Sequence, residues 1–327
     1  MDNAGKYREL REMHKEFIYH GYDIADDGIF FHFSIDDYHF YPSWKTESGL
    51  LKNVTPFLEY IIFNLGMAEL VSYWKCACPP VFRVECGEMS EDDKAFFKKL
   101  WFNGLGEFFY RNGIKTDIDS FVRIDAPEPK NIPQCEDYVS SGIEIVPVGG
   151  GKDSAVTTEL LHPFGDKLRF FTVNDQPART QCVLAGGYSE DKIIKIYRTI
   201  DPELLKRNAE GFLNGHTPFS SVVAFISMYA GFINGANDII LSNESSANES
   251  NIGGESVNHQ YSKSFEFERD FDEFRRRNFP QSAVYFSLLR PFCELQIAKQ
   301  FSQYKQYHLI FRSCNRGSKK NIWCCEC

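Results

Sequence analysis

The sequence predicts an α/β protein in which an N-terminal α+β unit precedes a parallel sheet with helices on its faces. Three observations support this prediction. After residue 141, short apolar runs alternate with helical stretches, which is the pattern of parallel strands connected by helices. A glycine-rich turn links the first of these runs to the helix that follows it. Before residue 125, strand-like and helix-like patterns occur without this regular alternation.

The composition limits the class of protein and its partners. The chain has 327 residues, 43% of them hydrophobic, which is enough for one large domain or two medium ones. A formal net charge of −9 disfavours a polyanionic partner such as nucleic acid. The first residues contain no apolar core of the signal-peptide type, and no apolar run approaches the roughly 20 residues that span a bilayer. We therefore expect a cytoplasmic protein with no membrane partner, whose cysteines are thiols or metal ligands.

Periodicity predicts the elements of the first part. Apolar and polar side chains alternate along residues 30–35, which indicates a strand, and residues 36–41 are expected to turn and return as a hairpin. Residues 55–75 and 91–112 have helical patterns. Ser90 precedes three acidic residues and is expected to cap the second helix, because carboxylates are favoured at the positive end of a helix dipole.

A proline-containing segment between residues 123 and 141 marks the expected domain boundary. It contains Pro127, Pro129 and Pro133 among polar residues. Such a segment cannot continue a helix or a central strand, so we expect it to be a linker. We accordingly expect an N-terminal domain at 1–140 with a substrate-binding role, and a second domain at 141–327 that ends in a cysteine-rich tail.

The second domain is expected to contain the parallel sheet. The apolar runs predicted to form its strands are residues 144–148, 168–173, 193–197, 238–242 and 309–312. Helical patterns at 154–161 and 219–233 lie between them. Because ligands of open α/β folds bind where the strands end, the polar residues that follow each strand are candidates for a site.

The stretch from Gly149 to Ser154, Gly-Gly-Gly-Lys-Asp-Ser, connects the first predicted strand to a helix. Its glycines leave backbone N–H groups uncovered, and the helix N-terminus adds further donors and a partial positive charge. These features predict an anion-binding pocket. The stretch does not match the Walker loop G-x-x-x-x-G-K-[ST], because Asp153 follows Lys152. It does not match the dinucleotide motif G-x-G-x-x-G either, because position 154 is serine.

Residues 150–154 resemble the PP-loop, S-G-G-x-D-S, of the ATP pyrophosphatase family, although positions 148–149 are Val-Gly where that family often has a serine nearby. The resemblance implies a Rossmann-like parallel sheet of the PP-loop (adenine nucleotide alpha hydrolase-like) type and cleavage of ATP to AMP and pyrophosphate. Lys152 would then neutralise the leaving pyrophosphate, and Asp153 would help to hold Mg²⁺. The residues that would cradle the pyrophosphate are Gly149, Gly150, Gly151 and Ser154.

Polar residues follow two other predicted strands. Asn174 and Asp175 end the second strand, where the PP-loop resemblance places adenine and ribose. An ordinary turn would explain these two residue types equally well. Glu244 follows the strand at 238–242, at the edge where α/β proteins collect ligands, and we expect it to contribute to the nucleotide and substrate site.

Three further side chains are candidates for acid–base roles near the substrate. His216 precedes an apolar helix and lies in a predicted loop, although lone histidines are more often structural. His259 and Lys263 follow a segment rich in Asn, Ser, Glu and Gly.

The tail cysteines Cys314, Cys324 and Cys327 follow a C-x9-C-x2-C pattern, which suits a zinc thiolate site. Three ligands are one fewer than a closed structural zinc site needs. Cys325 could be the fourth, but adjacent cysteines seldom bind one ion together. A chain that stops before its last ligand and a reduced cysteine-rich tail are the alternatives.

Together these features resemble the MurL-type family of UDP-N-acetylmuramoyl-L-alanyl-L-glutamate epimerases. The segments that carry the resemblance are residues 65–75, 104–108, 149–154, 214–216, 241–244, 258–263 and 313–315, with the Trp-Cys pair at 323–324. The resemblance implies that ATP drives the inversion of the terminal L-Glu of a UDP-muramoyl dipeptide to D-Glu through an acyl-adenylate. Similar cysteine tails occur in the cyano-deazaguanine synthases, another PP-loop family, so the tail alone does not separate the two families.

The implied reaction is chemically coherent. Adenylation of the α-carboxylate removes its negative charge and makes the Cα–H bond more acidic, so that a base can remove the proton and an acid can return one from the other face. The candidates for the base and the acid are His216, His259 and Lys263. The candidates for binding UDP and carboxylates are Arg179, Arg290 and Arg312.

Two other functions compete with this interpretation. The first is a PP-loop nucleobase-modifying enzyme of the cyano-deazaguanine synthase or tRNA-thiolation type. The net charge of −9 disfavours tRNA, and deazaguanine chemistry would not normally need so large an N-terminal part. The second is an ATP-binding regulator without turnover, which the complete Lys152-Asp153-Ser154 set disfavours, because binding alone does not require groups that stabilise pyrophosphate.

Overall fold

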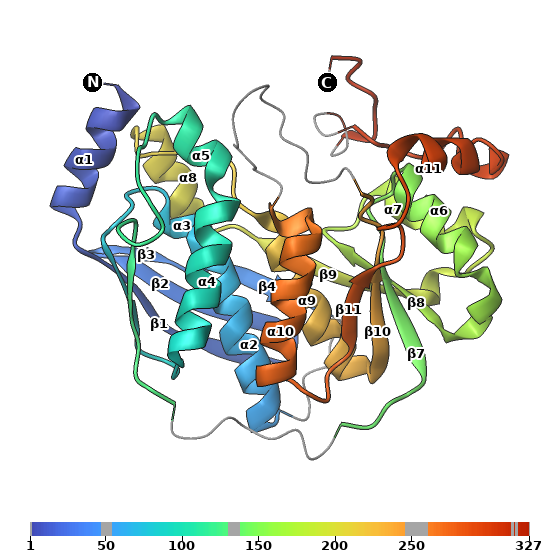
Figure 1. Ribbon diagram of the computed structural model, residues 1–327, viewed down its shortest axis with the longest axis horizontal. Helices are drawn as coiled ribbons and strands as arrows, with labels where there is room; N and C mark the ends of the chain where they lie inside the picture. Colours follow the sequence, from blue (N-terminus) through green and yellow to red (C-terminus); the bar gives the residue numbers. More distant parts are fainter. Residues whose placement is uncertain are drawn as a thin grey trace. The chain divides into compact units, whose positions relative to one another are not determined.

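The computed structural model describes residues 2–46, 54–129, 138–245, 261–314, 317 and 320–326. These residues form two compact units, and Figure 1 colours the chain from blue at the N-terminus to red at the C-terminus. The first unit takes its residues from 1–135, 198–226 and 248–270, and the second from 136–197, 227–247 and 271–327. Each unit is therefore assembled from separate stretches of the chain.

The sheet of the first unit is built around two long antiparallel strands. Its strands are β1 (Glu16–Ala25), β2 (Gly28–Ile35), β3 (Tyr38–Phe40), β4 (Ser43–Lys45), β5 (Val81–Val84) and β6 (Arg123–Asp125). Strand β2 pairs antiparallel with β1, β3 and β4, whereas β5 runs parallel to β1 and β6 runs parallel to β5. The alternation along residues 30–35 buries Phe31 and Phe33 completely on one face. The predicted strand and hairpin are confirmed.

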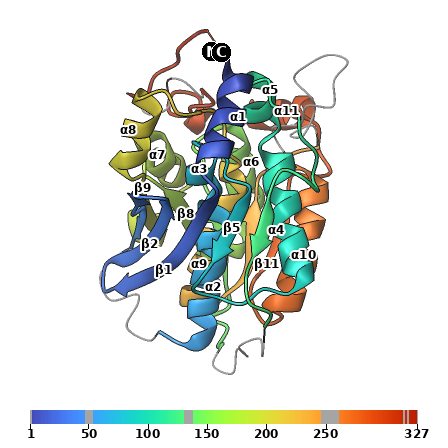
Figure 2. The same ribbon diagram turned by 90° about the vertical axis from the view of Figure 1, so that its left-hand side faces the viewer.

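Helices cover the apolar face of this sheet. The helices of the first unit include α1 (Asn3–Met13), α2 (Pro56–Glu69), α3 (Val71–Trp74), α4 (Glu91–Gly104), α5 (Gly106–Arg111) and α8 (Pro202–Ala209). Figures 1 and 2 show α2 and α4 on the same side of β1 and β2. Gly66 of α2 lies so close to the sheet that a side chain there would collide with Tyr19 and Phe31. The packing of α2 on these rings therefore requires a glycine.

The predicted helices of the first part are confirmed, each divided into two helices, and so is the predicted cap at Ser90. Thr55 caps α2 by accepting a hydrogen bond from the Leu58 amide at 3.2 Å. The Ser90 hydroxyl accepts one from the Asp93 amide, also at 3.2 Å, as its position before three acidic residues predicts.

The second unit contains an all-parallel sheet. Its strands are β7 (Ile143–Pro147), β8 (Leu168–Val173), β9 (Ile193–Thr199), β10 (Ala236–Leu241) and β11 (Val284–Ser287), in the order β11-β10-β7-β8-β9. Every neighbouring pair in this order is parallel, so all the strands end at the same edge. The α/β class and the four predicted strands between residues 144 and 242 are confirmed.

Helices connect these strands. The helices of the second unit include α6 (Lys152–Leu160), α7 (Pro177–Ala185) and α11 (Glu294–Phe301), with parts of α9 (Phe219–Asn234) and α10 (Phe265–Asn278). The predicted helices at 154–161 and 219–233 correspond to α6 and α9. Among the described helices, none combines the length and the apolar character needed to cross a membrane.

The predicted strand at 309–312 is wrong. Leu309 lies in a turn and is 88% exposed, while the fifth strand of the sheet is β11, which the sequence pattern did not predict. Instead of pairing with a strand, the end of this run contacts the glycine loop: the Arg312 amide donates to the Gly150 carbonyl oxygen at 2.8 Å. Strand β11 has only four residues, which is too short for a clear alternation.

The start of the predicted linker belongs to the fold. Residues 123–125 form β6, a three-residue strand whose partner among the described strands is β5, along one side. Edge strands tolerate such short polar sequences. Residues 130–137 lie outside the described part of the chain, and the domain limits 1–140 and 141–327 stay a prediction.

Candidate functional site

The glycine loop lies between the end of β7 and the start of α6, at the carboxyl edge of the second unit's sheet. Gly150 has a φ of +80°, in the left-handed region that side chains rarely adopt. A Cβ atom at Gly150 would lie 3.0 Å from the Ala178 carbonyl carbon and 3.0 Å from the Arg179 nitrogen. Position 150 therefore requires glycine both for its conformation and for its close approach to α7.

The protein itself occupies some of the loop's backbone donors. The Gly149 amide donates to Ser154 Oγ at 2.9 Å, and the Lys152 amide donates to Ser313 Oγ at 3.3 Å. Among the residues that the structure describes, the amides of Gly150 and Gly151 have no hydrogen-bond acceptor. Backbone N–H groups normally find a partner, so these two amides are the loop's available anion donors.

The side chains at the start of α6 form a compact charged group. Lys152 Nζ lies 2.7 Å from Asp153 Oδ1 and 3.2 Å from Glu294 Oε1. Burial alone would lower the pKa of Lys152, but the two carboxylates raise it above its ordinary value, so the ammonium stays protonated. Burial raises the pKa of Asp153, Lys152 opposes this rise, and the charges of Glu294 and Glu244 add to it.

Glu244 lies in the same region of the second unit, as its position after β10 predicts. It is buried, and its carbonyl oxygen accepts a hydrogen bond from Arg290 Nη1 at 2.9 Å. The negative charge of its carboxylate contributes to raising the pKa of Asp153. The structure therefore places Asp153 and Glu294 against the Lys152 ammonium group, with Glu244 near enough to Asp153 to influence its pKa.

Asn174 and Asp175 follow β8 at the same sheet edge, and both have structural partners. The Asp175 carboxylate accepts hydrogen bonds from the Gln176 amide at 2.9 Å and from Thr180 Oγ1 at 2.8 Å. It also lies 3.3 Å from Lys195 Nζ. Asn174 is exposed and has a φ of +54°, which asparagine tolerates better than most residues. Asp175 thus organises the turn into α7, and the exposed Asn174 side chain is the better placed of the two to meet a ligand.

The acid–base candidates lie elsewhere in the chain. His216 belongs to the first unit, where its side chain is 38% exposed and Nδ1 lies 3.9 Å from Glu107 Oε2. Lys263 also belongs to the first unit and is exposed at the end of the short 3-10 helix η3 (Tyr261–Lys263). His259 lies outside the described residues. Of the two described candidates, both belong to the first unit, whereas the glycine loop belongs to the second.

The arginines proposed for UDP and carboxylate binding donate to backbone carbonyl groups. Arg179 Nη1 donates to the carbonyls of Val173 and Asn174. Arg290 Nη1 donates to Glu244, and Arg312 Nη1 donates to Phe311 at 2.8 Å. Each guanidinium thus helps to shape a loop of the second unit.

The described tail cysteines are arranged around one sulfur atom. Cys314 is buried, and its Sγ accepts hydrogen bonds from the amides of Gly317 at 3.1 Å and Cys324 at 3.3 Å. The Cys324 sulfur accepts one from the Glu326 amide at 3.4 Å. Such N–H donors favour a thiolate, the form that binds zinc. The third predicted ligand, Cys327, lies outside the described residues.

Two residues of the site were missed by the sequence analysis. They are Glu294, which begins α11, and Ser313. Ser313 Oγ accepts a hydrogen bond from the Lys152 amide and lies beside the position that a Cβ atom at Gly151 would take. A glutamate at a helix start is common for reasons of helix stability alone, so Glu294 carries no distinctive signal. Ser313 is 161 positions from its partner, and no local pattern predicts that contact.

Comparison with known proteins identifies relatives over most of the chain. The family described as "MurL N-terminal domain" matches residues 9–288, a range that contains residues of both units. A protein of Xanthomonas oryzae pv. oryzae named "UDP-N-acetyl-alpha-D-muramoyl-L-alanyl-L-glutamate epimerase" is 34% identical over 76% of this chain and 54% of its own length. Proteins with the same name from Micromonospora sp. and Salinispora tropica are 32% and 31% identical over 83% and 79% of this chain.

These relatives are considerably longer than the chain. The matched region covers 54% of the Xanthomonas protein, 60% of the Micromonospora protein and 56% of the Salinispora protein. The chain therefore spans a little more than half the length of the curated relatives it matches.

Proposed function

The chain belongs to the MurL N-terminal domain family, and on that basis we propose that it converts the terminal L-Glu of UDP-N-acetylmuramoyl-L-alanyl-L-glutamate to D-Glu. This reaction would serve the synthesis of a peptidoglycan precursor in the cytoplasm. The proposal rests on three relatives that carry this name and are 31–34% identical to the chain.

We propose that ATP supplies the energy and is cleaved to AMP and pyrophosphate at the glycine loop. The observation that carries this step is the pair of amides of Gly150 and Gly151, which have no acceptor among the described residues and lie at the N-terminus of α6. Lys152 would balance the charge of the departing pyrophosphate. This combination favours a PP-loop, because a turn that only relieved crowding would not need donors and an ammonium group together.

The charge around Lys152 supports a role for Mg²⁺. Asp153, Glu244 and Glu294 place three carboxylates near the loop, which would repel a polyphosphate on their own. Oxygen ligands of this kind suit Mg²⁺, which binds through one or two carboxylates together with phosphate oxygens. Asp153 is the ligand we propose, and bound Mg²⁺ would offset the negative charge that accumulates there.

The proposed reaction proceeds through an acyl-adenylate. An oxygen of the glutamate α-carboxylate attacks the α-phosphorus of ATP, and pyrophosphate leaves. A base then removes the Cα proton, an acid delivers a proton to the opposite face, and water releases AMP and the D-Glu carboxylate. His216, His259 and Lys263 remain the candidates for the base and the acid.

We also propose that the tail binds zinc through Cys314, Cys324 and Cys327. The two amides that donate to Cys314 Sγ support this, because they would stabilise the thiolate. Bound zinc would hold the segment that contains Ser313 against the loop. The proposed role is structural, since it places no reacting group on the ion.

One assay tests the proposed reaction. The chain is incubated with ATP, Mg²⁺ and UDP-N-acetylmuramoyl-L-alanyl-L-glutamate, and AMP and D-Glu are quantified. We expect AMP release that depends on the dipeptide, and we expect Lys152→Ala to lower its rate by about 10²-fold or more. Lys192→Ala is the matched control, because Lys192 also has a carboxylate partner, Asp166 at 3.1 Å, but lies outside the loop.

Two results would contradict the proposal. AMP release that is unchanged in Lys152→Ala would remove the loop from the reaction. AMP release that requires tRNA or a deazaguanine acid, and not the dipeptide, would support the nucleobase-modifying alternative.

A further inference from the structure

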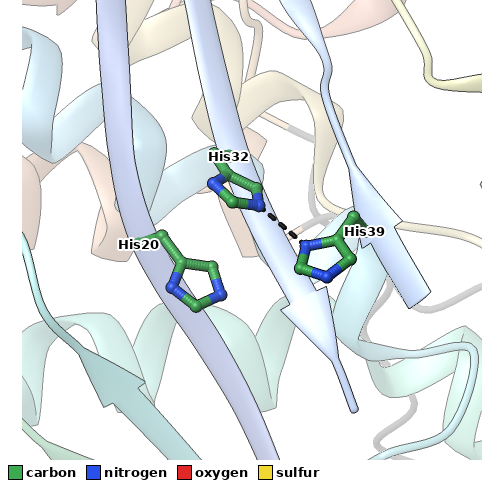
Figure 3. A group of neighbouring side chains, drawn as sticks. All are labelled: His20, His32 and His39. Atoms are coloured by element: carbon green, nitrogen blue, oxygen red, sulfur yellow. Dashed lines mark hydrogen bonds between the residues drawn. The ribbon is translucent and has the colours of Figure 1, made fainter. Parts of the chain in front are cut away.

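Three histidines meet on the sheet of the first unit. His20 lies on β1, His32 on β2 and His39 on β3. One nitrogen from each ring can be chosen so that the three atoms lie within 4.8 Å of one another. Figure 3 shows the three rings side by side, with a hydrogen bond of 2.8 Å between His32 Nε2 and His39 Nδ1.

Strand register explains why these residues meet. His39 pairs directly with Ser34, and His32 lies two positions before Ser34. The side chains of His32, Ser34 and His39 therefore project from the same face of the sheet. The β1–β2 register shifts between Tyr19 and Gly21, so that His20 and Gly21 together oppose His32. Since Gly21 has no side chain, the space beside His32 is left to the His20 ring, and the two ring centroids are 4.4 Å apart.

A carboxylate orients the first of these rings. Glu85 Oε2 lies 2.8 Å from His20 Nδ1, and the carboxylate favours the tautomer in which Nδ1–H donates to it, which leaves Nε2 with a lone pair. In this tautomer the Ser34 hydroxyl donates to His20 Nε2, also at 2.8 Å. A carboxylate behind an imidazole is the usual outer partner of a metal-binding histidine, because it fixes the tautomer and raises the basicity of the other nitrogen.

The neighbouring rings influence His32, and solvent reaches the cluster. Burial lowers the pKa of His32, and the neighbouring His20 and His39 rings lower it further, against the opposing effect of Asp23 and Glu85. His20 is partly exposed and His39 is exposed, so an ion from solvent can reach the cluster.

We propose that His20, His32 and His39 bind one Zn²⁺-class divalent cation through three imidazole nitrogens, with a fourth position open to water. Zn–N bonds of 2.0–2.1 Å in a tetrahedral site imply nitrogens about 3.3 Å apart. His32 and His39 would therefore separate by about half an ångström and exchange their shared hydrogen bond for two bonds to the ion. Three nitrogen ligands without carboxylate suit Zn²⁺ and Cu²⁺ and disfavour Mg²⁺ and Ca²⁺.

The site makes a binding prediction that needs no assay of activity. The full chain is stripped with a chelator, and Zn²⁺ binding is measured by calorimetry for the wild type and for His39→Gln, a change at an exposed position. We expect the variant to lose one equivalent of bound Zn²⁺. His162→Gln, at an exposed histidine of the second unit, is the matched control and should keep it. Glu85→Gln should weaken binding by about 10- to 100-fold and still bind, because it removes only the outer partner.

Co²⁺ separates this site from the tail cysteines. Thiolate ligands give Co²⁺ an intense charge-transfer band, whereas imidazole ligands leave only weaker visible bands. In a Cys324→Ser background, we expect Co²⁺ to show the visible bands without the thiolate band, and His39→Gln to remove them. Equal Zn²⁺ stoichiometry and affinity in the wild type, His39→Gln and His32→Gln would overturn the proposal. So would Co²⁺ bands that persist in both histidine variants.

Discussion

Lys152 and Glu144 show how single charged side chains respond to their surroundings in the second unit. Lys152 is held as a cation by carboxylates, which raise its pKa. Glu144 lies on β7, is buried, and has a raised pKa because of burial and the nearby charge of Asp238 on β10. Burial raises the pKa of Asp238 as well. The first arrangement stabilises a charge, whereas the second disfavours one, because burial raises the pKa of both carboxyl groups.

The Glu144–Asp238 pair predicts a pH dependence of stability. A carboxyl group whose pKa is raised by folding stabilises the protein fully below its unfolded pKa, and this contribution is lost as pH rises through the raised value. Glu144→Gln keeps a neutral donor beside Asp238 at every pH. We expect its Tm to exceed that of the wild type by a few degrees at neutral pH, and the difference to vanish in acid. Thermal unfolding at several pH values measures this, with Glu12→Gln on exposed α1 as the control. A difference that does not depend on pH would count against the raised pKa of Glu144.

At the scale of elements, the approach of the β7–α6 turn to α7 shapes the glycine loop. Gly150 combines a positive φ with backbone atoms of Ala178 and Arg179 at 3.0 Å from where a Cβ would lie. Gly187 has a similar φ of +85°, but nothing lies within 4 Å of its Cβ position. A comparison of the two glycines therefore distinguishes the cost of a positive φ, which both have, from the cost of a steric clash, which a side chain would meet at Gly150 and not at Gly187.

This pair yields a prediction about the loop. We expect Gly187→Ala to cost about 1 kcal/mol of stability through its φ alone. Gly150→Ala should cost about 2–4 kcal/mol, because the backbone of α7 must also move. Urea denaturation of both variants measures the difference. Equal losses would show that the close approach of α7 contributes nothing.

At the scale of the whole molecule, the first unit is discontinuous in sequence and is held together by a buried ion pair. Arg198 Nη2 lies 2.6 Å from Glu69 Oε1, and Arg198 Nε donates to both carboxylate oxygens. Glu69 is completely buried, and the two residues are 129 positions apart. The pair connects the segment that begins at residue 198 to helix α2.

Removal of one partner of this pair should be strongly destabilising. Glu69→Gln leaves the Arg198 guanidinium buried without a countercharge, and we expect a loss of about 3–5 kcal/mol in the free energy of unfolding. Glu16→Gln is the control, because its pair with Arg83 is exposed and is worth about 0–1 kcal/mol. The double change Glu69→Leu and Arg198→Met should lose less than Glu69→Gln, since apolar residues need no countercharge. Losses of equal size in the buried and exposed variants would refute this account.

The sequence by itself determined what depends on neighbouring residues. The alternation at 30–35 predicted β2, Ser90 predicted the start of α4, and the glycines at 149–151 predicted the strand–turn–helix unit. Each signal acts over a few residues, through side-chain direction, a cap or a backbone angle. The resemblance of local motifs led to the same family that the comparison identified.

Only the tertiary structure decided which distant residues meet. The contact of Ser313 with the loop joins residues 161 positions apart, and the run at 309–312 supports that loop instead of forming a strand. The histidine cluster depends on a one-residue bulge at His20. The bulge shifts the pairing register by one residue, so that neighbouring side chains face the side of the sheet opposite to the one that simple alternation predicts. Such contacts are selected by packing and hydrogen bonding across the whole chain, so no local pattern contains them.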